Sequence, residues 1–100
     1  RKAAHIIQPD VSWCGGITEA KKICTLANKN NITVIPHRGG EAWGLHLVAA
    51  MQCPLAEIGT SGIKSDSAVE GMPELNNGYL SPFDKPGLGV KWGNNSKQLL

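Results

Sequence analysis

The sequence feature that most constrains the fold is an apolar run that ends at a polar side chain and then opens into a glycine pair, and it occurs twice. IIQPDVSWCGG spans residues 6–16 and carries Asp10, while ITVIPHRGG spans residues 32–40 and carries His37 in the matching place. Short apolar runs without alternation are typical of strands covered on both faces, and paired glycines let the backbone turn sharply. The pattern predicts strands at residues 4–8 and 32–36 of a parallel sheet.

Two helices and a third strand are predicted around these runs. Apolar residues recur at three- and four-residue intervals from Thr18, the expected N-cap, to about Lys29, and Asn30-Asn31 should end this helix. Residues 41–51 predict a second helix with one apolar face, formed by Ala42, Leu45, Val48 and Ala49. Residues 55–58 then form a third apolar run. The alternation of strand and helix favours right-handed βαβ units.

The remainder of the chain has a different character. Residues 59–93 are rich in glycine and proline with weak periodicity, which predicts a long loop followed by a hairpin-like tail through NNGYLSPF and GLGVKW. Three parallel strands alone leave two sheet edges exposed. The sequence therefore indicates either a small doubly wound sheet or the last part of an eight-stranded barrel, and periodicity does not separate the two. The missing initial methionine suggests a piece of something longer.

Composition narrows the classes of function. The chain of 100 residues is 41% hydrophobic and 18% charged with a formal charge of +2, so it lacks the basic excess typical of nucleic-acid binding. Its apolar runs are shorter than a membrane-spanning helix requires, and no signal segment opens the chain, so we expect a cytoplasmic protein. The three cysteines lack C-x-x-C spacing, which indicates reduced thiols rather than a disulfide framework or a zinc site.

Three ionisable residues fall where the predicted strands end: Asp10, His37 and Glu57. In either architecture, loops that carry function gather at the carboxyl ends of parallel strands. Neighbouring strands lie about 4.8 Å apart, so Asp10 and His37 are expected to form a dyad in which the carboxylate orients the imidazole for acid/base catalysis. Glu57 is placed to contact a substrate oxygen. The alternative is that each side chain only caps a helix or pairs within its loop.

Other polar and aromatic residues near these strand ends have two interpretations each. Arg38 is a candidate ligand for a substrate carboxylate or hydroxyl, or it pairs with a nearby acid. Trp13 and Trp43 either wall a pocket or serve in core packing or an interdomain contact. His46, within the second helix, is expected to be a packing residue. Cys14 is a poor candidate nucleophile because no orienting third group accompanies it.

Four stretches together carry a family resemblance: IIQPDVSWCGGITEAKKICTLA, VIPHRGGEAWGLHLVAAM, LAEI and GYLSPFDKPGLGVKW. They resemble the C-terminal part of enolase-superfamily enzymes of the mandelate racemase subgroup, most of all acid-sugar dehydratases such as rhamnonate dehydratase. The resemblance implies an α/β fold formed by the last three βα units of a TIM-type barrel. Residues 1–58 would supply barrel strands six to eight, and residues 59–100 a loop and tail that return toward a capping domain.

The resemblance also implies a function. Asp10 and His37 match the family's acid/base dyad, and Glu57 matches the acidic residue on the last strand; Arg38, Trp13 and Trp43 are expected to bind substrate. The complete enzyme would be a Mg²⁺-dependent hydro-lyase that removes the proton α to the carboxylate of a sugar acid and expels the β-hydroxyl. The metal ligands and a second acid/base lysine lie outside these 100 residues. The chain alone is therefore expected to be inactive.

The expected partners are a small sugar acid, the remaining barrel and capping domain, and further copies of the chain in a homo-oligomer. Neither a nucleic acid nor a membrane is expected. Two alternatives stay open: a racemase or epimerase that uses the same dyad without elimination, and a small α/β binding module without catalysis. A zinc site built from His37, His46 and Cys14 fails on ligand spacing and lacks a fourth partner.

Overall fold

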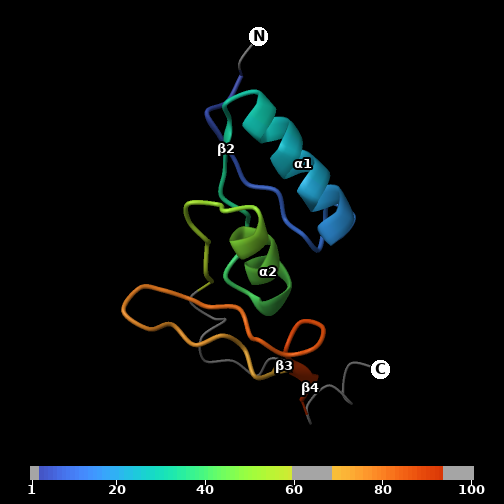
Figure 1. The fold of residues 1–100 in the computed structure, drawn as a ribbon, viewed down its shortest axis with the longest axis vertical. Helices are drawn as coiled ribbons and strands as arrows, with labels where there is room; N and C mark the ends of the chain where they lie inside the picture. The colour runs from blue at the N-terminus through green and yellow to red at the C-terminus, as the bar shows by residue number, and fades with distance from the viewer. Residues whose placement is uncertain (1–2, 60–68, 94–100) are drawn as a thin grey trace.

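The computed structural model describes residues 3–59 and 69–93, and the structural statements that follow concern these two ranges. Two strand–helix pairs come first, and a short antiparallel strand pair follows them (Figure 1). The elements, in chain order, are β1 (Ile6–Ile7), α1 (Ile17–Lys29), β2 (Thr33–Val34), α2 (Ala42–Ala50), β3 (Val69–Glu70) and β4 (Lys91–Trp92).

The predicted parallel pairing of the first two apolar runs is confirmed. Ile6 pairs with Thr33 and Ile7 with Val34, while backbone bonds join the same two segments on either side of these pairs. The last of them runs from the His37 N–H to the Pro9 carbonyl at 3.1 Å, where an isolated bridge sets Asp10 opposite His37. The regular strands are shorter than predicted because proline, present near the end of each run, cannot donate to a ladder.

Residues 55–58, predicted as a third strand, do not form one. One backbone hydrogen bond joins this segment to the turn before α2, from the Gly40 N–H to the Glu57 carbonyl at 2.8 Å. A single bond does not make a ladder, and Leu55 remains 63% exposed. Of the three predicted parallel strands, therefore, two pair within the described residues.

Helix α1 agrees closely with the prediction, but its first residue does not. The N-cap is Gly16 rather than Thr18, with a φ of 88° that favours glycine. At the other end Asn30 is the C-cap, and Asn31 takes a positive φ of 54°, so the two asparagines end the helix as predicted. Neither helix in the described ranges has the length and apolar character needed to cross a membrane.

Helix α2 buries two of the four residues expected on its apolar face, Ala42 and Leu45, together with Gly44 and Leu47. The other two differ from the prediction, because Ala49 is exposed and Val48 only half-buried. Almost every residue of this helix is apolar or small, so the apolar periodicity does not indicate which side of the helix faces the core. Packing decides which side is covered.

The core lies between the two strands and the two helices. Helix α1 faces it with Ala20, Cys24 and Ala27, at the four- and three-residue spacing of one helical face. Val34 enters from β2 and Leu47 from α2. The carboxyl ends of β1 and β2 are thereby fixed side by side.

The tail lies beyond α2, on the side away from α1 (Figure 1). β3 and β4 pair antiparallel, and an Asn76–Tyr79 bridge closes a tight turn at Asn77 and Gly78, both with positive φ. The hairpin-like character was predicted, whereas β3 lies within the stretch predicted as loop. Residues 60–68 of that loop and residues 94–100 of the tail lie outside the described ranges.

Candidate active site

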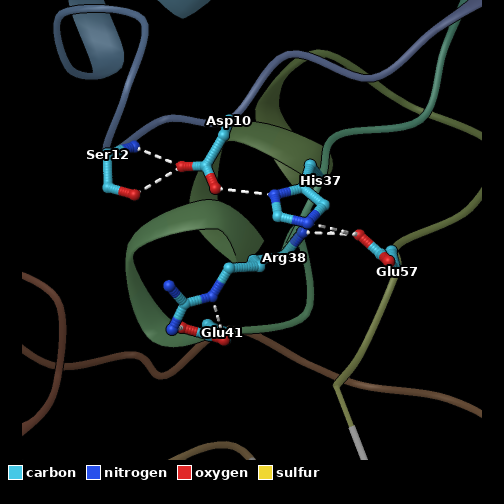
Figure 2. A network of polar contacts seen from close by, with 6 residues as sticks. All are labelled: Asp10, Ser12, His37, Arg38, Glu41 and Glu57. Carbon is cyan, nitrogen blue, oxygen red and sulfur yellow. Dashed lines mark hydrogen bonds and ion pairs between the residues drawn. The ribbon is translucent and has the colours of Figure 1, made fainter.

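The centre of the site is the contact between Asp10 and His37. Oδ2 of Asp10 lies 2.7 Å from Nδ1 of His37 (Figure 2). The Asp10 side chain is 4% exposed, while that of His37 is 37% exposed. The dyad thus has a buried acid and an imidazole that reaches the surface. The parallel register produces it, because residues 10 and 37 stand opposite each other.

The second oxygen of Asp10 is held by Ser12. Both the backbone N–H, at 2.7 Å, and the hydroxyl of Ser12 donate to Oδ1. Burial by itself raises the pKa of Asp10, but the hydrogen bonds from Ser12 and His37 outweigh it and hold the pKa below its ordinary value. The carboxylate is therefore anionic at neutral pH, as an orienting partner for His37 requires.

Glu57 approaches the opposite side of the imidazole. Its Oε2 lies 3.7 Å from Nε2 of His37 and accepts a 2.9 Å bond from the Arg38 N–H. Figure 2 shows His37 between the two acids, with Nδ1 toward Asp10 and Nε2 toward Glu57. Asp10, His37 and Glu57 come together as predicted, although Glu57 does so from a segment that forms no strand.

Arg38 uses its side chain within the protein. The guanidinium bonds both oxygens of Glu41, at 2.6 Å from Nε and 2.8 Å from Nη2, and lies 5.3 Å from the centre of the Trp43 ring. The hydrogen bonds that Arg38 donates to Glu41 raise the pKa of Arg38. Of the two interpretations of Arg38, the structure shows pairing with a nearby acid; part of the side chain, 40%, stays exposed.

The two tryptophans differ in their surroundings. Trp13 is 78% exposed, and its ring centre lies 5.6 Å from that of His37 at an angle of 40°. Trp43 is half-buried and packs against the core cluster, with its Nε1 lacking a hydrogen-bond partner among the described residues. Trp13 borders the site directly, whereas Trp43 touches it only through Arg38.

Glycines allow α2 to approach the turn that carries His37. A Cβ on Gly44 would lie 2.8 Å from the Arg38 carbonyl oxygen and from the Gly39 Cα, and a Cβ on Gly39 would lie 2.9 Å from the Pro36 carbonyl oxygen. A side chain at Gly44 would push the helix away from the turn. The close contact helps to fix His37 against Asp10.

The described residues do not fit a magnesium site. No group of three or more His, Cys, Asp or Glu side chains within them can hold a metal ion. Both Asp10 oxygens are bonded to Ser12 and His37, and both Glu41 oxygens to Arg38. These carboxylates bind protein donors, and not a cation.

The remaining candidates have packing roles. His46 Nε2 lies 3.4 Å from the Leu88 carbonyl oxygen, so this histidine joins α2 to the tail. The three cysteines are free, and burial raises the pKa of Cys53 to about 11 and also raises that of Cys24. Such thiols stay protonated at neutral pH.

Two residues of this network were not identified from the sequence: Ser12 and Glu41. Each has a local signal. An acid followed two residues later by serine favours a turn in which the carboxylate accepts the backbone N–H, and Arg38 and Glu41 have the i, i+3 spacing of an ion pair. Neither local pattern predicts that the Ser12–Asp10 bond or the Arg38–Glu41 pair will lie beside the imidazole of the dyad.

Comparison with known proteins places this geometry in a family. Residues 1–96 match the family described as "Enolase C-terminal domain-like". The 3,6-anhydro-D-galactonate cycloisomerase from Zobellia galactanivorans is 33% identical, with a TM-score of 0.79 over 95% of this chain and 28% of that one.

Two further solved structures agree with this match. A mandelate racemase/muconate lactonizing enzyme from Jannaschia sp. CCS1 is 34% identical (TM-score 0.71; 93% of this chain, 25% of that one). An enolase of the mandelate racemase subgroup from Agrobacterium tumefaciens is 27% identical (TM-score 0.74; 96% and 28%). The chain thus spans little more than a quarter of these proteins and corresponds to the C-terminal portion of their barrel domains. The chain belongs to the enolase superfamily, in its mandelate racemase/muconate lactonizing subgroup.

Proposed function

We propose that this chain supplies the Asp-His acid/base dyad and the last-strand acid of a Mg²⁺-dependent acid-sugar dehydratase. The observation that carries the proposal is the placement of His37, whose Nδ1 is fixed by Asp10 at 2.7 Å while Nε2 faces the Glu57 carboxylate at 3.7 Å. An imidazole held in this way has one nitrogen committed to orientation and one available for proton transfer.

The proposed steps follow from these contacts. The Nδ1–H donates to Asp10, so Nε2 carries the exchangeable proton and delivers it to the β-hydroxyl as that group leaves the substrate. Asp10 stabilises the charged imidazolium in the intervals when both nitrogens are protonated. Glu57, with one oxygen held by the Arg38 N–H, accepts a hydrogen bond from the substrate.

The structure supports the proposed substrate-binding roles of Trp13, Arg38 and Trp43 to different degrees. The Trp13 ring, exposed beside His37, provides an apolar surface for the carbon chain of a sugar acid. Arg38 keeps its Nη1 group outside the two bonds to Glu41, and this group can donate to a substrate hydroxyl. Trp43 contributes by supporting the Arg38 side chain.

The substrate class rests on the sequence resemblance to acid-sugar dehydratases and on the similarity to an enzyme that acts on 3,6-anhydro-D-galactonate. In this proposal the magnesium ligands, the second acid/base lysine and the capping domain belong to barrel segments outside the present chain. The complete enzyme is cytoplasmic and a homo-oligomer. Racemisation or epimerisation by the same dyad is the second candidate, supported by the similarity to a mandelate racemase/muconate lactonizing enzyme.

The test uses the complete gene product with Mg²⁺ and a panel of aldonates and aldarates. A dehydratase forms a 2-keto-3-deoxy acid, whereas a racemase or epimerase returns the epimer and exchanges the α-proton in D₂O without losing water. His37→Asn should lower either activity by about 10²–10⁴-fold. An active enzyme that is indifferent to His37→Asn would remove the dyad from the mechanism.

A second experiment addresses the alternative of a binding module without catalysis. The isolated chain is titrated with a chemical denaturant and followed by circular dichroism. Cooperative two-state unfolding of a monomer would favour the independent module, whereas a gradual transition supports a chain that folds as part of a barrel.

A further inference from the structure

We propose that Ser12 is a positioning residue of the acid/base dyad, which fixes the Asp10 carboxylate so that a single oxygen, Oδ2, faces His37. The inference rests on the proposed function, since it concerns the same site. Ser12 donates twice to Oδ1, through its backbone N–H at 2.7 Å and through its hydroxyl. Oδ2 is left for Nδ1 of His37, also at 2.7 Å. The two carboxylate oxygens are therefore assigned different partners.

There is a physical reason for the two carboxylate oxygens of Asp10 to have separate partners. Asp10 is 6% exposed, so water does not orient its carboxylate. Rotation about the side chain would move Oδ2 away from His37, and the bonds to Oδ1 oppose that rotation. The turn is secured at its base, because the Trp13 and Cys14 N–H groups both donate to the Asp10 carbonyl at 3.1 and 2.9 Å. Ser12 thus stands where the turn geometry presents its hydroxyl to the acid.

The charges around Asp10 set the direction of the pH effect. His37 contacts Oδ2, and the positive Arg38 is close enough for Asp10 to raise its pKa. Glu57 lies across the imidazole, and Glu41 pairs with Arg38. Among these groups the Ser12 hydroxyl is a neutral donor that lowers the pKa of Asp10. Its removal makes the carboxylate more basic and the dyad harder to deprotonate.

The experiment compares three variants of the complete gene product. Ser12→Ala removes the hydroxyl and keeps the backbone bond, Ser12→Thr restores a hydroxyl, and Thr25→Ala removes an exposed hydroxyl of α1 that bonds only the Lys21 carbonyl. We expect Ser12→Ala to lower kcat about five- to tenfold with little change in KM. The limb of the kcat/KM profile that reports the dyad should move to higher pH. Ser12→Thr should restore both, and Thr25→Ala should change neither.

A second measurement does not depend on the substrate. In ¹⁵N NMR, the His37 ring signals of the wild type should report a protonated Nδ1, whereas those of Ser12→Ala should shift toward the other tautomer. Unchanged His37 ring signals and an unchanged pH profile in a folded Ser12→Ala variant would overturn the positioning role. If the wild type turns over no sugar acid, the proposed function fails, while the NMR comparison still decides the role of Ser12.

Discussion

The two described parts of the chain differ in what holds them in place. In residues 3–59, buried side chains from both helices and β2 form one core, the half-buried Ile7 of β1 packs against it, and the site residues bond one another. In residues 69–93 no large apolar side chain is fully buried, and Tyr79 and Trp92 are each 78% exposed and Leu75 46% exposed. This segment is held by two short antiparallel contacts and by packing against α2 and Gly40.

The difference indicates where the contacts that hold the site are concentrated. The dyad is buried at Asp10, and the hydrogen bonds that hold it come from residues within 3–59. Exposed aromatic side chains in the tail are typical of a surface that packs against another segment. The predictions below test whether function and stability are concentrated in residues 3–59, beginning with the largest expected effect.

The largest effect is expected on catalysis. Asp10→Asn keeps the shape of the acid but removes its charge and can place His37 in the wrong tautomer, so activity of the complete gene product should fall by about 10²–10⁴-fold. Glu74→Gln, a matched neutralisation of an exposed acid in the tail, should leave kcat unchanged. Equal losses in the two variants would contradict the assignment of catalysis to residues 3–59.

The next effect is on folding. Leu47→Ala empties a position that is 3% exposed and should lower the free energy of unfolding by about 2–5 kcal/mol. Leu75→Ala, at 46% exposure, should cost less than about 0.5 kcal/mol. Denaturant titration of the complete gene product measures both. A cost for Leu75→Ala close to that for Leu47→Ala would show that the tail is covered by another segment.

A smaller effect is expected for ion pairs. Glu41→Gln removes a carboxylate that is 8% exposed and leaves Arg38, 40% exposed, without its partner, so the cost should be about 1–2 kcal/mol. Glu19→Gln breaks the exposed pair with Lys22 and should cost less than about 0.5 kcal/mol. Thermal or chemical unfolding distinguishes the two. Similar costs would mean that burial of Glu41 does not matter.

The smallest effect concerns pH. The native pKa of Asp10 lies below its ordinary value of 3.8, so its ionised form stabilises the folded state above about pH 4, and this contribution is lost as the pH falls through the native pKa. The difference in unfolding free energy between wild type and Asp10→Asn should therefore shrink on acidification below about pH 4. A difference that stays constant from about pH 6 to about pH 3 is the contrary result.

The parts of the fold with strong local signals were predictable. Helix α1 has a clear apolar period and two terminal asparagines, and its extent was predicted to within two residues. Helix α2 was found, but its buried side was predicted only in part, with Ala42 and Leu45 correct, because an almost wholly apolar helix has no preferred face by periodicity. The third strand was wrong: residues 55–58 have strand composition, yet a strand also needs consecutive backbone partners.

For the candidate site, the sequence by itself determined which residues stand at the ends of the apolar runs: Asp10, His37 and Glu57. For Asp10 and His37 this placement is at one edge of the parallel pair, because the carboxyl ends of parallel strands coincide, whereas Glu57 reaches the site from a segment that forms no strand. Only the tertiary structure decided that residues 10 and 37 share a register, that Ser12 takes one oxygen of Asp10, and that Arg38 turns to Glu41. These contacts depend on side-chain direction and on the approach of segments distant in sequence, and local patterns do not encode either.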